Sequence, residues 1–258
     1  MLNEEKLLSA AGDCGCVIHI VPETGSTNDD MKAMAAYGAP DGTVIVTDKQ
    51  KNGKGRMGRS FFSPRSGVYL SMLLRPEADV LQSLHYTVVG AVAVCRTIEK
   101  ISGRKAQIKW VNDVYVDGKK VCGILAEGSV SGDRPDWIIV GIGTNITPPE
   151  GGFPPDIASR AGALFEDGDA PRGISELYAA ELIRELRALM SLSRETVDEV
   201  IAEYRERSLV IGRDIIAVTP AGERPCRAVG VTDAAELMVE YPDGKMGILF
   251  SGEVSLKL

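Results

Sequence analysis

The sequence predicts an α+β protein, with a mixed β-sheet domain flanked by helices and a small β-module at its C-terminal end. Two observations support this prediction. β-branched runs such as Thr43–Thr47 (TVIVT) are mixed with segments of helical periodicity, and the expected strands outnumber the helices. After Gly212 the helical periodicity stops, and short alternating runs are broken by turn residues at 220–222 and 242–244. We therefore expect a large domain at 1–208 and a small antiparallel barrel or sandwich at 209–258.

The first part of the large domain contains a clear helix start. Ser26 and Thr27 each precede an acidic residue by three positions, which is the capping-box pattern. The helix that begins here should end at Gly38, because glycine is the usual residue after a helix. The elements expected in this part are, in chain order, helix 1–12, strand 17–21, helix 27–37, strand 43–47, loop 49–59 and strand 68–74.

The second part alternates strands and helices without an internal repeat. Leu84, Val88 and Val92 follow helical spacing, and Gly103 should end that helix. Asp117-Gly118 lies between two apolar runs and predicts a tight hairpin. The elements expected in this part are, in chain order, helix 81–101, strand 108–116, strand 120–126, strand 137–143, a Pro/Gly-rich stretch at 147–156, helix 173–191 and helix 194–208.

Charge and residue counts exclude several classes of protein. The 258 residues include 29 Lys or Arg and 36 Asp or Glu, a net charge of −7, whereas general nucleic-acid binders are strongly basic. No apolar run reaches the roughly 18–20 residues that span a membrane, and the N-terminal segment is acidic, so we expect a cytoplasmic protein without a membrane partner. Five cysteines without a CxxC pair and only two histidines argue against a zinc site or a histidine-based triad.

Residues 53–58 (GKGRMG) match the dinucleotide-binding fingerprint GxGxxG, but the surrounding sequence does not fit that motif. The preceding strand ends about six residues too early, the following segment contains Pro64, and position 75 is Arg instead of an acid. The charge of the loop is more informative, since five cations and no acid lie between Lys49 and Arg59. Glycines and cations in one loop can wrap polyphosphate, so we expect a phosphate or nucleotide site; a solvated charged face is the alternative.

Lys109 is the unusual residue of the segment IKWVNDVYVDGKKVCGILAEG. Alternation along one strand would place Lys109 and Val111 on the same face. A lysine within a half-buried sheet is costly unless it meets an anion, so Lys109 is either a solvated charge at a strand edge or a functional cation. Gly123 on the return strand would permit a close approach to the backbone, or would mark a bulge.

Nearby amides and a carboxylate complete the candidate site. Asn112 and Asp113 follow Lys109, and Asn145 ends the apolar strand VGIGTNI. Asn145 could cap a turn or read the edge of an adenine, because its amide both donates and accepts hydrogen bonds. Together with the basic loop, these residues predict one cleft for an anionic nucleotide and an uncharged ligand.

Four segments, in this order, resemble the biotin protein ligase family: TGSTND, QKNGKGRMGRSFFSP, IKWVNDVYVDGKKVCGILAE and VGIGTNI. The final GEVSLKL is similar to the last barrel strand of that family, so the resemblance covers about residues 17–258. It implies a class II synthetase-like catalytic domain and an SH3-like C-terminal barrel. It also implies that biotin and MgATP react to give biotinyl-5′-adenylate, from which biotin passes to a lysine of a biotin carboxyl carrier protein domain.

The resemblance implies roles for individual residues. Lys109 and Arg56 would be the catalytic cations, with Lys109 bridging the biotin carboxylate and the α-phosphate. Asp113 would help to hold Mg²⁺. The biotin site would comprise Ser26, Thr27, Asn28, Gln50, Gly53, Lys54, Gly55, Arg56, Lys109 and Gly123. The ATP site would comprise Arg56, Arg59, Phe61, Lys109, Asn112 and Asn145.

The sequence departs from the family pattern at three positions, where Lys54 replaces Arg, Phe61 replaces Trp and Val111 replaces Pro. None of these changes removes a chemical group that the reaction needs. The first motif begins at residue 26, too early for the winged-helix domain of family members that repress genes, so we expect a monofunctional ligase that does not bind DNA. Both a monomer and a homodimer remain open.

Three other functions remain open at this stage. A lipoate–protein ligase or octanoyltransferase has a related fold and also depends on a lysine. A nucleotide- or RNA-binding regulator would use the basic loop, and an NAD-dependent enzyme would rest on GxGxxG alone. Exchange of pyrophosphate into ATP that requires biotin distinguishes the ligase from all three.

Overall fold

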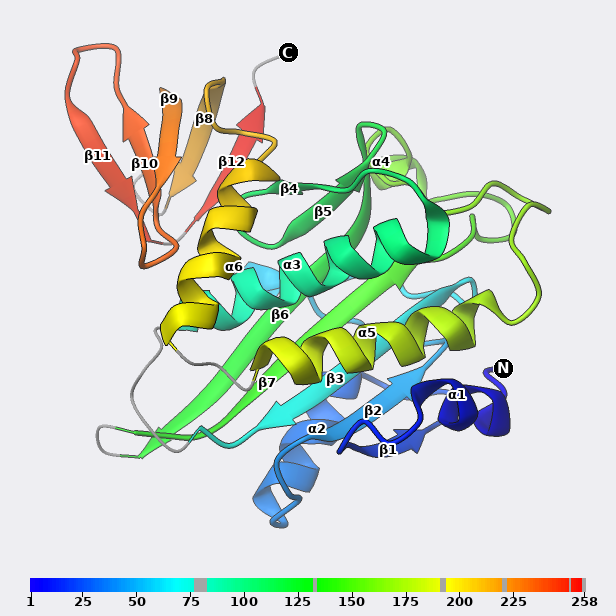
Figure 1. Ribbon diagram of the computed structural model, residues 1–258. Coiled ribbons are helices and arrows are strands. Elements are labelled where there is room, and N and C mark those ends of the chain that lie inside the picture. Colours follow the sequence, from blue (N-terminus) through cyan, green and yellow to red (C-terminus); the bar gives the residue numbers. More distant parts are fainter. Residues whose placement is uncertain (77–82, 132–133, 191–193, 220–221, 251, 257–258) are drawn as a thin grey trace.

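Two β-sheets organise the protein (Figure 1). The computed structural model describes residues 1–258 apart from 77–82, 132–133, 191–193, 220–221, 251 and 257–258. Seven strands form the larger sheet, in the spatial order β1 (Val17–Ile20), β2 (Thr43–Thr47), β3 (Gly67–Leu74), β7 (Arg134–Asn145), β6 (Lys119–Ser131), β5 (Asp113–Val116) and β4 (Gln107–Lys109). Five antiparallel strands form the smaller sheet, in the order β11 (Met246–Leu249), β10 (Leu237–Glu240), β9 (Gly222–Val231), β8 (Asp214–Thr219) and β12 (Glu253–Leu256). The α+β prediction and the C-terminal β-module are confirmed.

Helices cover the two faces of the larger sheet unequally. The long helices α3 (Ser83–Ser102) and α5 (Ile174–Met190) lie on one face, and α2 (Thr27–Ala36) lies on the other (Figure 1). Helix α1 (Glu4–Ala11) packs on α5, α6 (Arg194–Glu206) packs on α3, and a short α4 (Pro155–Ala158) follows the Pro/Gly-rich stretch. No helix among the described residues is long and apolar enough to cross a membrane.

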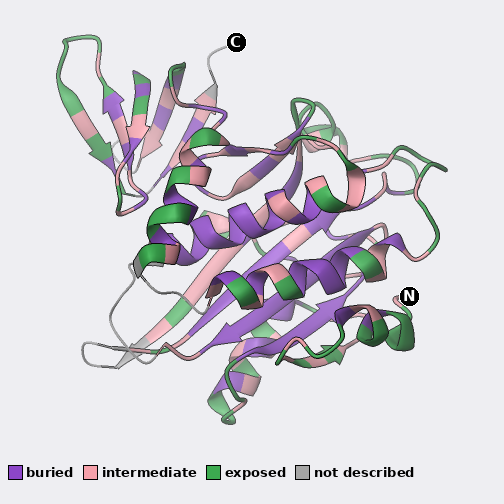
Figure 2. Cartoon of the chain, in the orientation of Figure 1, coloured by how far each residue is buried: buried purple, intermediate pink, exposed green. Residues whose placement is uncertain are grey.

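The main core lies between the larger sheet and α3 and α5, where buried side chains predominate (Figure 2). Alternation along β3 sends Val68, Leu70 and Met72 into this core. Tyr69 and Ser71 therefore point to the opposite face, toward α2. Apolar contacts on that face form a much smaller cluster around Met31 and Leu73. The α2 face thus has room for polar groups, and the candidate site is built there.

The predicted single strand at 108–116 is wrong. The chain turns back at residues 110–112, so that β4 and β5 are antiparallel neighbours and Lys109 pairs with Asp113. Lys109 therefore shares a face with Asp113 and not with Val111. Trp110 at this turn is buried, and its Nε1 donates a hydrogen bond to the carbonyl of Ala235, 3.0 Å away and 125 residues along the chain. Local alternation carries no information about such a contact.

The remaining elements agree with the sequence prediction to within a few residues, although β6 and β7 are longer than expected. The hairpin at Asp117-Gly118 is confirmed, since both residues have positive φ (48° and 75°), as a two-residue type I′ turn requires. The start of the helix expected at 81–101 lies outside the described residues at 81–82. The turn expected at 220–222 and the end of GEVSLKL also fall partly outside them, at 220–221 and 257–258.

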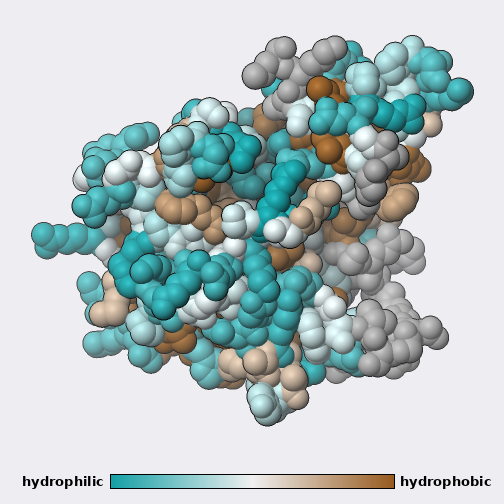
Figure 3. Space-filling view, turned by 180° about the vertical axis from the view of Figure 1, so that it is seen from behind, coloured by the Kyte–Doolittle hydropathy of each residue, from teal (hydrophilic) through white to brown (hydrophobic). Residues whose placement is uncertain are grey.

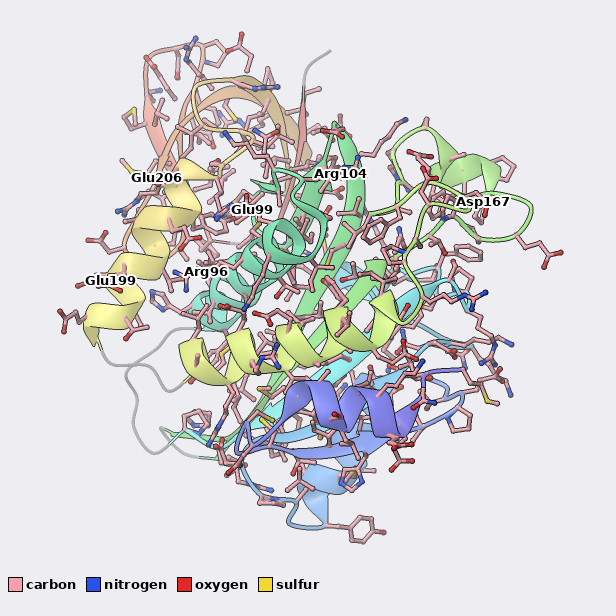
Figure 4. The ribbon with its side chains drawn as sticks, turned by 45° about the vertical axis from the view of Figure 1, so that its right-hand side comes forward. Arg96, Glu99, Arg104, Asp167, Glu199 and Glu206 are labelled. Atoms are coloured by element: carbon pink, nitrogen blue, oxygen red, sulfur yellow. The ribbon has the colours of Figure 1, made fainter. Side chains whose placement is uncertain are left out.

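The C-terminal module is attached to the larger domain through α3, α6 and the β9–β10 turn. In addition to the Trp110 bond, His85 Nε2 lies 2.8 Å from the Asp233 carbonyl, and Arg205 Nε donates to the Val231 carbonyl at 2.7 Å. Helix α6 is itself fixed to α3, because Arg96 of α3 pairs with Glu203 of α6 at 2.5 Å. Figure 4 labels Arg96 beside α6. These contacts hold β12 beside the larger domain.

Removing the indole N–H of Trp110 should weaken this attachment. We expect Trp110→Phe to lower the free energy of unfolding by about 1–3 kcal/mol, because the Ala235 carbonyl loses its donor in a buried place. Urea denaturation measures the change. Trp137→Phe is the matched control, since Trp137 is only partly buried beside α2. Equal losses in the two variants would contradict a specific role for the Trp110 bond.

Candidate active site

A row of directly paired residues crosses the larger sheet from β4 to β3. Lys109 pairs with Asp113, Asp113 with Gly123, Gly123 with Gly143, and Gly143 with Tyr69. Paired residues point to the same face of a sheet, so the charged end of this row and Tyr69 face the α2 side together. Gly141 lies two residues before Gly143 on the same face. We call Gly123, Gly141 and Gly143 the glycine floor, because they leave the backbone of the sheet open between larger side chains.

Phe61 lies on one part of the glycine floor. A Cβ atom at Gly143 would be 2.6 Å from Phe61 Cε1, and one at Gly123 would be 3.0 Å from Phe61 Cε2. The ring also meets Tyr69 edge-on, with ring centroids 6.4 Å apart, and lies 5.9 Å from Lys120 Nζ. The close approach expected at Gly123 is confirmed. The bulge alternative is wrong there, since the β5–β6 register shifts between Val114 and Tyr115.

Asn28 lies on the other part, at the start of α2. A Cβ atom at Gly141 would be only 2.0 Å from Asn28 Oδ1, so the missing side chain at Gly141 makes space for this amide. Asn28, Ser26 and Thr27 are all buried. Asn28 Oδ1 lies 2.6 Å from Ser71 Oγ, and Thr27 Oγ1 lies 2.8 Å from the same atom. These polar groups therefore lie close together on the sheet.

The capping-box prediction for α2 is wrong. Ser26 is the N-cap residue but its side chain makes no capping hydrogen bond. Gln50 caps the helix from the loop instead, because its Oε1 accepts from the backbone N–H of Thr27 at 2.9 Å. Asp29 pairs with Lys54, and Asp30 accepts a hydrogen bond from Thr24. The start of α2 is thus fastened to the loop 49–63.

The five cations of the loop are not all available to a ligand. Lys49 and Lys51 pair with Glu23 at 2.7 and 3.0 Å. Lys54 pairs with Asp29, and Arg59 pairs with Glu253 of β12, both at 2.5 Å. Four of the five cations therefore have a carboxylate partner outside the loop, although Lys49 and Lys51 share the single carboxylate of Glu23. Arg56 is the loop cation without such a partner among the described residues.

Arg56 and Lys109 are the cations that remain. Both are half-buried, and neither has a carboxylate partner within hydrogen-bonding distance among the residues that the structure describes. Arg56 donates to Asn112 Oδ1 at 3.3 Å. Burial lowers the pKa of both side chains, while the charges of Asp113 and Glu253 raise it in both cases, so the two cations lie in one locality. A site of this kind suits an anion, which would restore the lost solvation of the charges.

The other predicted residues frame the same region. Asn112 Nδ2 donates to the Ile124 carbonyl at 2.9 Å, and Asp113 pairs with Lys120 at 2.6 Å. Asn145 is buried at the end of β7, where its Nδ2 donates to the Gly162 carbonyl at 2.8 Å. Gly53 accepts from the backbone N–H of Phe61 at 2.8 Å and has no space for a Cβ atom, and Gly55 donates to the Arg59 carbonyl.

Figure 3 shows the molecule from the side opposite to Figure 1, and hydrophilic side chains cover much of it.

Sequence reasoning missed several residues that the fold brings to this region. Ser71 and Tyr69 come from an apolar strand, and Glu253 comes from the small module. Glu127 lies on the same face of β6 as Gly123 and contacts Asn28. Glu127 directly follows the apolar run of the strand expected at 120–126, and an acid at that place was a usable signal.

Comparisons with known proteins agree on one family. Residues 21–145 match the model of the biotin/lipoate A/B protein ligase family. The chain is 31% identical over 235 residues to the bifunctional ligase/repressor BirA of Bacillus subtilis, covering 90% of this chain and 71% of that protein. It is 32% identical over 231 residues to the biotin–[acetyl-CoA-carboxylase] ligase of Mycobacterium tuberculosis, covering 86% and 83%. The structure is similar to that of the biotin protein ligase from Aquifex aeolicus in complex with biotin and ATP, with a TM-score of 0.74, 28% identity and coverage of 93% and 98%.

The glycine floor yields a prediction about stability. Gly141→Ala should push the Asn28 amide away from Ser71, because the added Cβ atom would overlap Asn28 Oδ1. We expect the free energy of unfolding to fall by about 1–3 kcal/mol, measured by urea denaturation. Gly230→Ala is the control, since its nearest neighbour would be Met238 Sδ at 3.6 Å. A loss at Gly141 no larger than at Gly230 would show that this space is not needed.

The Lys54–Asp29 pair yields a second prediction, about the loop. Asp29→Asn should free Lys54 and let the loop open more often. An exposed ion pair stabilises by roughly 1 kcal/mol at most, so cleavage of the loop by trypsin should accelerate up to about fivefold. Asp243→Asn in the exposed Asp243–Lys245 pair is the control and should leave the cleavage rate in the loop unchanged. An unchanged rate for Asp29→Asn would mean that the pair does not restrain the loop.

Proposed function

Because the chain belongs to the biotin protein ligase family, we infer that it is a biotin–[acetyl-CoA-carboxylase] ligase. It joins biotin to AMP at the expense of ATP and then transfers biotin to a lysine of a biotin carboxyl carrier protein. The observation that carries this inference is the pair of half-buried cations, Arg56 and Lys109, beside the glycine floor. Both lie within the residues that match the family model.

The first step brings two anions together. A carboxylate oxygen of biotin forms a bond to the α-phosphorus of ATP, and the bond from that phosphorus to pyrophosphate breaks. Lys109 lies between the carboxylate and the α-phosphate and stabilises the charge that develops there. Arg56 contacts phosphate from the loop, held by Asn112. Half-burial strengthens both interactions, since charges interact more strongly away from bulk water.

Biotin and ATP occupy neighbouring parts of the cleft in this proposal. The polar wall of Ser26, Thr27, Asn28 and Gln50 receives the ureido group of biotin, whose two N–H donors and one carbonyl acceptor match hydroxyls and amides. Gly53 and Gly123 leave space that the loop and the Phe61 ring occupy, so these glycines, together with Gly55, let the loop lie closely beside the biotin site.

The nucleotide side is formed by Phe61, Arg59, Asn112 and Asn145, with the Phe61 ring beside adenine. Arg59 and Lys54 are engaged with Glu253 and Asp29. This pairing favours a role for both in holding the loop over the adenylate, where it limits hydrolysis.

Mg²⁺ enters with ATP, and Asp113 is the carboxylate that we propose for it. Mg²⁺ is typically held by one or two carboxylates and by substrate phosphates, so a single acid fits. Among the described residues no group of three or more His, Cys, Asp or Glu side chains forms a protein cage for a metal. The bound ion would neutralise phosphate charge during the transfer.

The second step needs no covalent enzyme intermediate. The lysine amine of the carrier attacks the acyl carbon of the adenylate, the bond to phosphate oxygen breaks, and AMP leaves. Cys122, next to Gly123, is fully buried, and burial raises the pKa of its thiol to about 12. Cys122 is therefore a packed thiol in this proposal and not a nucleophile.

Exchange of labelled pyrophosphate into ATP tests the function directly. We expect exchange that requires biotin, followed by transfer of biotin to a carrier domain. Exchange with lipoate or octanoate but not with biotin would overturn the assignment in favour of the related ligases. The absence of any exchange would favour a regulator or another nucleotide-binding role.

Replacing Lys109 should separate activity from stability. We expect Lys109→Met to slow adenylate formation by about 10²–10³-fold, because the main stabilising charge is lost. The free energy of unfolding should not fall, since burial lowers the pKa of Lys109 and the charged form therefore costs stability at neutral pH. Single-turnover kinetics and urea denaturation measure the two quantities. Lys245→Met, at an exposed lysine, should change neither; a large loss of stability at Lys109 would indicate a structural role instead.

A further inference from the structure

Asn28 is held in one orientation by three neighbours of different chemistry. Its Nδ2 donates to Glu127 Oε2 at 2.8 Å and reaches the Leu125 carbonyl at 3.4 Å. Its Oδ1 lies 2.6 Å from Ser71 Oγ. The amide is only 4% exposed, so bulk water is largely kept from competing for these positions.

The carboxylate of Glu127 is the closer of the two acceptors that set the direction of the hydrogen bonds. It pairs with Lys32 at 2.7 Å and can only accept hydrogen bonds, so the nitrogen of Asn28 must face it. Asn28 Oδ1 then faces Ser71, whose single hydroxyl hydrogen is used to donate to it.

The same direction continues to Thr27. Ser71 Oγ can only accept from Thr27 Oγ1, 2.8 Å away, because its own hydrogen is already used. Thr27 Oγ1 also lies 3.2 Å from Gln50 Oε1, an oxygen that can only accept. The single hydrogen of Thr27 Oγ1 is therefore directed to Ser71 or to Gln50, and a lone pair of the oxygen is left as an acceptor. The Thr27 backbone N–H donates to Gln50 Oε1 at 2.9 Å, which fixes the residue on its other side.

We propose that Glu127 is a positioning residue for biotin, which acts through Asn28 to orient the Ser71 and Thr27 hydroxyls. Thr27 Oγ1 is thereby presented as an acceptor to an N–H of the ureido group. This proposal rests on the function proposed above and adds two residues, Glu127 and Ser71, to its biotin site. Neither residue needs to touch biotin itself.

An isosteric change at Glu127 tests the direction of this series of hydrogen bonds. In Glu127→Gln the new amide can donate or accept, so Asn28 and the two hydroxyls lose their single arrangement. We expect KM for biotin in pyrophosphate exchange to rise about tenfold or more, the scale of a lost hydrogen bond to a charged group. KM for ATP and the maximal rate should stay within about threefold, because the interaction concerns biotin alone.

A double-variant cycle shows whether Glu127 acts through Asn28. In an Asn28→Ala background, Glu127→Gln should raise KM for biotin no further. Ser71→Ala interrupts the series of hydrogen bonds but leaves the Glu127–Lys32 ion pair in place. This variant should also raise KM for biotin selectively. This variant keeps the proposal testable if Glu127→Gln does not fold.

Glu203→Gln is the matched control, since Glu203 is a half-buried, ion-paired carboxylate on α6 with 21% side-chain exposure against 28% for Glu127. It should lower stability and leave KM for biotin unchanged. If the wild-type protein shows biotin-dependent exchange but KM for biotin is unchanged in Glu127→Gln or in Ser71→Ala, the proposal is overturned and the ligase function stands. An undiminished effect of Glu127→Gln in the Asn28→Ala background would also overturn it. No biotin-dependent exchange in the wild type would instead overturn the proposed function.

Discussion

Holding two cations partly out of water is the constraint on which the rest of the site depends. Arg56 and Lys109 lose solvation without gaining a carboxylate partner at hydrogen-bonding distance among the described residues, and burial lowers the pKa of both. An anionic ligand would compensate for the lost solvation of the two cations. The same two charges therefore contribute both to ligand binding and to catalysis. The β4–β5 turn, Asn112 and the Trp110 contact with the small module serve to fix their positions.

The glycines of the sheet have a related role. Gly141 makes space for the Asn28 amide, and Gly123 and Gly143 make space for the Phe61 ring. Polar and aromatic groups can therefore lie directly on a sheet whose other face is a closed apolar core. One face of the larger sheet stabilises the fold, while the other carries the chemistry.

The order of elements, the basic loop and a partly buried lysine at position 109 could be predicted from the sequence, because periodicity and charge patterns are local. The break at Trp110 was missed because its indole is fixed by Ala235, far along the chain. The ion pairs of the loop cations were missed for the same reason, since Glu23, Asp29 and Glu253 come from other parts of the chain. Glu127 was passed over because the expected strand ended at residue 126, whereas β6 continues to Ser131 and carries Glu127 on the same face as Gly123.

The ionisation of Lys109 tests most directly whether partial burial prepares this cation for an anionic ligand. Its ammonium can be followed by NMR of protein carrying ¹³Cε-labelled lysine, with the Lys109 signal identified by its loss in Lys109→Met. We expect Lys109 to titrate below the ordinary lysine value of 10.5 in the free protein, because burial lowers its pKa. The pKa should rise when a non-hydrolysable analogue of biotinyl-AMP binds, since an anion stabilises the ammonium. An ordinary pKa that does not respond to the analogue would contradict the account.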